Sequence, residues 1–311
     1  MRSMATSGDM GTDAAMDHAA DTGAAMRWDE RFLESADGLR LHYRDYAPEH
    51  DKAARLPVLC LAGLTRNSRD FERLAPHLQR ERRVLAADLR GRGRSARDAN
   101  WRNYQPGVYL ADLAALLDDA RVARVVIVGT SLGGLLAMML GAREPRRIAG
   151  IVLNDIGPEI DPVGRARIAT YVGRSPPVRN WDEAVGQSRA TYGIALPGFT
   201  DADWLTLARR SYVEVDGVPR LDMDAMIGEA VRNPPPDSPQ DVWPVFAALH
   251  AVPMLVLRGE LSDVLSATTL ARMEREHPRL HGVTVARRGH PPLLDEPESL
   301  AAIDAFLSRL P

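Results

Sequence analysis

The segment Gly129-Thr130-Ser131-Leu132-Gly133 places one serine between two glycines, directly after an apolar run and directly before a helix-like stretch. If the run is a strand that turns sharply into a helix, the serine must adopt a strained backbone conformation, and only small neighbours let the two segments pass so closely. The hydroxyl would then stand exposed above the carboxyl edge of a sheet. The free N–H groups of the helix would point at a developing oxyanion. This spacing predicts that Ser131 is a nucleophile.

A serine hydroxyl needs a base, and one histidine is suitably placed in the chain. His290, in Arg288-Gly289-His290-Pro291, follows the last apolar run and precedes a predicted helix over 297–309. A histidine on such a loop can lean over the sheet edge toward Ser131. We therefore predict that His290 takes the proton of the nucleophile.

The base in turn needs a carboxylate, which holds its tautomer and stabilises the imidazolium. Asp263 is the predicted acid, because it lies on the loop after the apolar run 254–257 and because the order Ser, Asp, His suits the serine motif. Two alternatives remain. Glu260 stands on the same loop, and Asp155 ends the strand that follows the nucleophile.

An oxyanion requires two backbone donors. One is expected to be the N–H of Leu132, next to the nucleophile. The other is expected on the loop after the run 58–61, where Gly63 permits a conformation that points the N–H of Leu64 inward.

The elements that must position these residues follow from the hydrophobic pattern. After the turn Asp37-Gly38, residues 40–46 alternate as an antiparallel strand does. Short apolar runs then alternate with stretches of helical spacing, which predicts an α/β fold whose parallel sheet is buried on both faces. The runs lie at 58–61, 84–87, 125–128, 151–153, 254–257 and 283–286.

This alternation stops between residues 158 and 243, a polar stretch that is rich in proline and carries helix-like pieces at 201–213 and 223–232. We interpret it as a helical cap over the site, inserted between two strands. Trp204 and Tyr212 are candidates for the substrate pocket of this cap. Arg66, close to the oxyanion loop, is a candidate for binding a substrate carboxylate, although a salt bridge with Asp70 is the simpler alternative.

Composition limits the remaining classes of function. The formal net charge of −3 and the scattered basic pairs argue against a nucleic-acid partner, and no window is apolar enough to span a membrane. The single cysteine, Cys60, is expected to be a buried, inert thiol, and the dispersed histidines predict no metal site. Residues 1–27 resemble a disordered leader without a secretory signal, so we expect a cytoplasmic protein that acts on a small molecule without a cofactor.

Several motifs together resemble the α/β-hydrolase fold superfamily, in the form with a helical cap between the sixth and seventh strands. They extend over roughly residues 30–310. They are Gly63-Leu64, the segment 88–95, the Ser131 motif, Asp263 and Gly289-His290. The resemblance implies an eight-stranded, mostly parallel sheet flanked by helices, with a core of residues 28–157 and 244–311 and a cap of residues 158–243. The segment 88–95 is interpreted as structural.

The resemblance also implies the reaction, a serine-dependent hydrolysis of an ester, lactone or thioester. Many relatives have His-Gly at the oxyanion loop, whereas this chain has Ala62-Gly63, which leaves backbone donation intact. C–C bond hydrolysis of a vinylogous diketone is an alternative. Thr130 argues against it, because hydrolases of ring-cleavage products often have Asn there. A ligand-binding protein without turnover is a further alternative, against which the complete Ser, Asp, His set argues.

Overall fold

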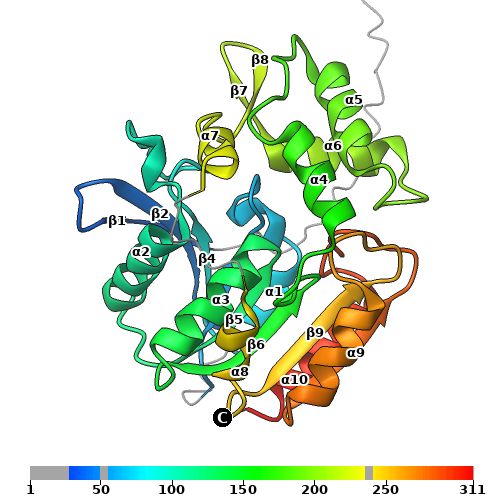
Figure 1. The fold of residues 1–311 in the computed structure, drawn as a ribbon. Helices are drawn as coiled ribbons and strands as arrows, with labels where there is room; N and C mark the ends of the chain where they lie inside the picture. The colour runs from blue at the N-terminus through cyan, green and yellow to red at the C-terminus, as the bar shows by residue number, and fades with distance from the viewer. Residues whose placement is uncertain (1–27, 50–54, 235–240, 311) are drawn as a thin grey trace, which may run out of the picture.

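The computed structural model describes residues 28–49, 55–234 and 241–310 (Figure 1). The predicted leader, residues 1–27, lies outside the described residues, as do residues 50–54, 235–240 and 311. Helices and strands alternate through most of the chain, in the following order: β1 (Asp29–Glu34), β2 (Arg40–Tyr46), β3 (Val58–Leu61), η1 (Ser68–Phe71), α1 (Leu74–Gln79), β4 (Val84–Asp88), η2 (Trp101–Asn103), α2 (Pro106–Asp119), β5 (Val125–Thr130), α3 (Leu132–Arg143), β6 (Ile148–Asn154), α4 (Pro162–Tyr171), α5 (Trp181–Tyr192), α6 (Asp201–Ser211), β7 (Tyr212–Val215), β8 (Val218–Leu221), α7 (Ile227–Arg232), α8 (Trp243–Ala247), β9 (Met254–Gly259), α9 (Ala267–Glu276), β10 (Leu280–Val285) and α10 (Pro297–Leu307).

The central sheet has eight strands in the order β1-β2-β4-β3-β5-β6-β9-β10. The six strands from β4 to β10 run parallel, and β1 and β2 form an antiparallel edge. Each of the six apolar runs that the sequence analysis selected overlaps a strand of this sheet, and only the last run, 283–286, extends one residue beyond its strand. The predicted fold class, a mostly parallel α/β sheet flanked by helices, is confirmed.

The sheet is buried on both faces because its strands are apolar at successive positions. In β3, Val58 and Cys60 belong to one hydrophobic cluster, whereas Leu59 and Leu61 belong to the other. Helices α2, α3 and α9 pack on the face of Leu59, and α1 and α10 pack on the face of Val58. The carboxyl ends of the parallel strands are thereby fixed relative to one another, and the loops that leave them form one edge.

Between β6 and β9 the chain leaves the sheet and builds a separate layer above it (Figure 1). This layer contains helices α4 to α7 and the two-stranded hairpin β7–β8, which the sequence analysis did not predict. Two small hydrophobic clusters lie within it, apart from the two clusters of the sheet. Helix α8 closes the segment, and its Phe246 packs into the core against the sheet. No helix of the described residues is long and apolar enough to cross a membrane.

Candidate active site

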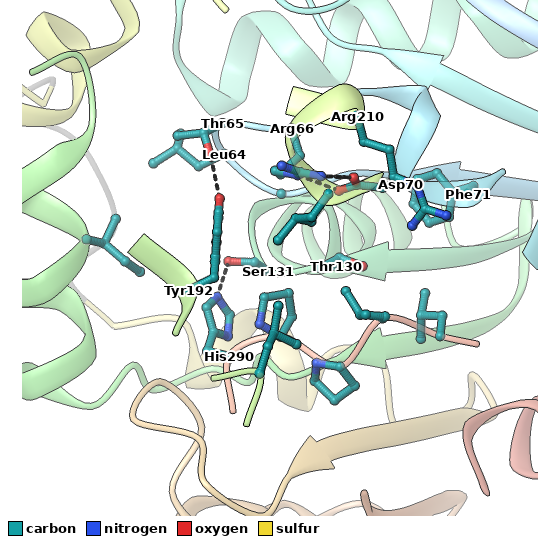
Figure 2. Close-up of a pocket in the computed structure, with 18 of the residues that line it drawn as sticks. Leu64, Thr65, Arg66, Asp70, Phe71, Thr130, Ser131, Tyr192, Arg210 and His290 are labelled. Carbon is teal, nitrogen blue, oxygen red and sulfur yellow. Dashed lines mark hydrogen bonds and ion pairs between the residues drawn. The ribbon is translucent and has the colours of Figure 1, made fainter. Parts of the chain in front are cut away.

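The turn from β5 into α3 holds Ser131 in a conformation that L-residues rarely adopt, with φ of 51° and ψ of −116°. The glycines at 129 and 133 are required because a larger side chain at either position would clash with the neighbouring backbone. A Cβ on Gly129 would lie 2.5 Å from the backbone of Gly133, and a Cβ on Gly133 would lie 2.2 Å from the carbonyl oxygen of Leu61. The structure therefore contains the predicted strained serine between two closely packed segments. The hydroxyl of Ser131 faces a pocket (Figure 2).

His290 and Ser131, predicted as base and nucleophile, lie side by side. The Nε2 atom of His290 is 3.0 Å from Ser131 Oγ (Figure 2). The other ring nitrogen, Nδ1, is 2.8 Å from Oδ2 of Asp155. Since a carboxylate only accepts hydrogen bonds, Nδ1 carries the proton and Nε2 is free to accept one from the serine.

The prediction that Asp263 holds the base is wrong. Asp263 instead forms a bidentate salt bridge with Arg167 of α4, with Nε–Oδ2 and Nη2–Oδ1 distances of 2.5 and 2.8 Å. Its carboxylate is thus bound to the layer above the sheet, and the hydrogen bonds from Arg167 hold its pKa below the ordinary value. Glu260, the other alternative on that loop, accepts a hydrogen bond from the backbone N–H of Arg287.

Asp155 is held by more than the histidine. Its Oδ1 accepts from the backbone N–H of Gly259 at 2.8 Å, and its Oδ2 also accepts from the hydroxyl of Ser262 at 2.6 Å. The residue is fully buried. The sequence analysis considered Asp155 but did not choose it, and it missed Ser262. The sequence feature that could have identified Asp155 is its position, because it directly follows the last residue of a buried strand.

The two predicted oxyanion donors have free N–H groups. Across the described residues, neither Leu64 nor Leu132 donates a backbone hydrogen bond to a protein acceptor. The carbonyl of Leu64 accepts a hydrogen bond from Nε of Arg92 at 2.6 Å, which holds the backbone of the loop in place. Arg92 belongs to the segment 88–95, so this segment supports the loop, in agreement with its structural interpretation.

The pocket in front of Ser131 has a volume of about 70 Å³. Its walls come from the sheet edge and from the layer above, which contributes Tyr171 of α4, Tyr192 of α5 and Leu207 of α6. The remaining wall combines polar and charged side chains with a group of aliphatic residues and prolines. The aliphatic residues and prolines are Leu64, Ile168, Leu196, Pro291, Pro292, Leu293 and Leu294.

Trp204 and Tyr212, predicted as substrate-binding residues, do not line this pocket. Trp204 is buried in a cluster within the upper layer and packs edge-on against Phe199. Tyr212 donates from its hydroxyl to Gln187 at 2.6 Å and packs in the neighbouring cluster. Both side chains hold helices together, because large aromatics stabilise a small layer most effectively when they are enclosed in it.

Arg66 lines the pocket, but each nitrogen of its guanidinium has a partner. Its Nε donates to both oxygens of Asp70, at 2.9 Å for Oδ2, its Nη2 donates to Asp70, and its Nη1 donates to Ser211. The alternative weighed for Arg66, a salt bridge with Asp70, is what the structure contains.

The remaining sequence predictions on chemistry concern cysteine and metal. Cys60 is fully buried in β3, and burial raises the pKa of its thiol. Among the described residues, no group of three or more His, Cys, Asp or Glu side chains is arranged to hold a metal ion.

Comparisons with known proteins agree with this architecture. Residues 57–192 match the model of the alpha/beta hydrolase fold family. An alpha/beta hydrolase from Novosphingobium aromaticivorans has 47% sequence identity and a TM-score of 0.85, over 92% of this chain and 100% of that one. The chain therefore belongs to the α/β-hydrolase fold superfamily.

Two relatives that match most of this chain are named as hydrolases. A 3-hydroxybutyrate-oligomer hydrolase from Cupriavidus necator is 29% identical over 89% of this chain and 97% of that protein. A 2-(acetamidomethylene)succinate hydrolase from Mesorhizobium japonicum is 28% identical over 80% of this chain and 87% of that protein. The fold and these relatives support hydrolase activity for the chain.

Proposed function

We propose that this chain hydrolyses a carboxylic ester, lactone or thioester of a small molecule through an acyl-enzyme on Ser131. The observation that carries the proposal is the connected set Ser131, His290 and Asp155, with hydrogen-bond distances of 3.0 and 2.8 Å. A strained serine beside a correctly protonated imidazole is the arrangement that acyl transfer needs. One relative is named for oligomers of a hydroxy acid, which are joined by ester bonds.

In the proposed first half-reaction, Nε2 of His290 takes the proton of Ser131 and Oγ attacks the carbonyl carbon. The negative charge moves to the carbonyl oxygen, which accepts from the N–H groups of Leu64 and Leu132. Asp155 stabilises the imidazolium that has formed. The bond to the leaving group then breaks, and the leaving alcohol or thiol takes its proton from His290.

In the second half-reaction, His290 takes a proton from water and the hydroxide attacks the acyl carbon. A second oxyanion forms on the same donors. It collapses to the carboxylic acid, and the proton returns from His290 to Oγ of Ser131. The layer above the sheet covers the reacting atoms, since three of its helices contribute to the pocket wall.

The test combines a covalent probe with a variant. A fluorophosphonate should label Ser131, identified by peptide mapping, and Ser131→Ala should abolish both labelling and p-nitrophenyl ester hydrolysis, with a loss of about 10⁴-fold or more. A folded Ser131→Ala variant that keeps a tenth of the wild-type rate contradicts the proposal. Turnover of a vinylogous diketone with no turnover of any ester would instead assign C–C bond hydrolysis.

A further inference from the structure

A second arginine lines the pocket, and it lacks the hydrogen-bond partners that Arg66 has. Arg210 is on α6, in the layer above the sheet, and lines the same pocket as Ser131 and His290. Figure 2 shows its guanidinium on the side of the pocket away from His290. Only 10% of its side chain is exposed.

The positive charge of the Arg210 guanidinium has few partners within the protein. Its buried Nε has no hydrogen-bond partner, and no atom of the guanidinium donates a hydrogen bond within the described residues. The nearest carboxylate oxygen is Oε2 of Glu72, at 3.9 Å. That carboxylate is already shared, because its Oε1 accepts from Arg44 at 2.9 Å. A cation removed from water without hydrogen-bond acceptors costs free energy that an anion in the pocket would recover.

Among the described residues, two arginines line the pocket, and Arg210 is the one whose guanidinium has no hydrogen-bonded carboxylate. Arg66 and Asp70 form a neutral pair there. Beyond Arg210, Leu207 and Leu293, a second cavity of about 180 Å³ adjoins the pocket. Two further arginines line this second cavity, but each is paired with a carboxylate. They are Arg73, 2.7 Å from Asp295, and Arg288, 2.9 Å from Glu296.

We propose that the substrate carries a carboxylate that Arg210 binds, separated by a short aliphatic chain from the ester carbonyl at Ser131. The inference rests on the proposed function and names the substrate class, an ester with an anionic end. A guanidinium presents two parallel N–H donors that match a carboxylate, and a single cation suits a single negative charge. The leucines and prolines of the pocket wall suit the aliphatic chain that joins the two groups.

The carboxylate can belong to the acyl part or to the alcohol part of the ester, and the assay distinguishes the two. For the acyl part, the substrate is mono-p-nitrophenyl adipate and its control is the same ester with a carboxamide in place of the carboxylate. For the alcohol part, the pair is 4-(butyryloxy)butyrate and its carboxamide, followed by acid release in a pH-stat. In at least one pair, kcat/KM of the wild type should favour the anionic substrate.

Arg210→Gln should lower kcat/KM for the preferred anionic ester about 10- to 100-fold, mostly through KM, and should leave the carboxamide within about threefold. Arg210→Lys should restore part of the loss, because it keeps the charge but not the paired donors. Arg209→Gln is the matched control, since Arg209 is the preceding residue of α6 and is exposed over the ring of Trp181. It should leave both substrates unchanged.

Two outcomes would overturn the inference. One is a wild-type enzyme that hydrolyses carboxamide and anionic esters equally well in both pairs. The other is an Arg210→Gln variant that loses the same factor on charged and neutral esters, which would make Arg210 a purely structural residue. Failure of the proposed function looks different, because no ester of either kind would then be hydrolysed and Ser131 would not react with a fluorophosphonate.

Discussion

Two aspartates leave neighbouring strands at the same edge of the sheet, and the protein uses them differently. Strands β6 and β9 are hydrogen-bonded in parallel, with Asn154 opposite Leu257. Asp155, directly after β6, is fully buried and contacts the imidazole of His290. Asp263, after β9, is partly exposed and contacts α4. One carboxylate supports the proposed base and the other anchors the layer that covers it, so the donors around each side chain decide its role.

The largest expected effect separates the two aspartates directly. In Asp155→Asn, the backbone N–H of Gly259 keeps the amide oxygen on its side, so the NH₂ group faces Nδ1 of His290. The imidazole must then present a lone pair at Nδ1 and carry its proton on Nε2, where it cannot accept from Ser131. We expect kcat on a p-nitrophenyl ester to fall by about 10⁴-fold with the fold intact.

Asp263→Asn is the matched variant for that measurement. It keeps the size of the side chain and contacts Arg167 rather than His290. We expect kcat within about threefold of the wild type, because Asp263 is partly exposed and water screens the effect of its charge on His290. A reversal of the two effects would return Asp263 to the role that the sequence analysis gave it.

An intermediate effect is expected at Ser262, which belongs to the β9 loop but donates to Asp155. Ser262→Ala removes one hydrogen bond to the buried carboxylate and should lower kcat about tenfold, measured with the same ester. Ser262→Thr keeps the hydroxyl and should recover most of the rate. Equal rates for wild type and Ser262→Ala would show that Gly259 and His290 alone hold Asp155.

The smallest expected effect is a change in thermal stability, and we expect it for Asp263 but not for Asp155. Hydrogen bonds from Arg167 lower the pKa of Asp263 below its ordinary value of 3.8. Such a group stabilises the folded state above the unfolded pKa, and the contribution disappears as the pH falls through the folded pKa. Near pH 7, Asp263→Asn should lower Tm by about 1–3 °C.

Calorimetry across pH measures this contribution. The Tm difference between wild type and Asp263→Asn should be constant from neutral pH down to about pH 5 and should shrink below pH 4. Arg167→Gln should give a similar difference, and the double variant should add little, because both changes break one pair. A difference that persists at low pH would mean that the anchor does not depend on the charge of Asp263.

The strands differ in how well the sequence predicts them. The parallel strands were predictable because each is a continuous apolar run, and both faces of such a strand must be buried. Strand β1, with charged residues at 29–31, carries no such signal, because it lies at the sheet edge and pairs only with β2. The hairpin β7–β8 is largely exposed and stabilised by its neighbours, so its four-residue strands leave little pattern in the sequence.

The sequence by itself determined the positions of Ser131 and His290 and the carboxyl edge where they meet. The reason is local, since a strained serine needs Gly129 and Gly133 and since these positions follow apolar runs. Only the tertiary structure decided which carboxylate contacts the imidazole of His290. Asp155 and Asp263 follow adjacent strands, and both could reach the histidine. The choice depends on where α4 places Arg167 and where Ser262 places its hydroxyl, contacts between residues far apart in the chain that no local pattern records.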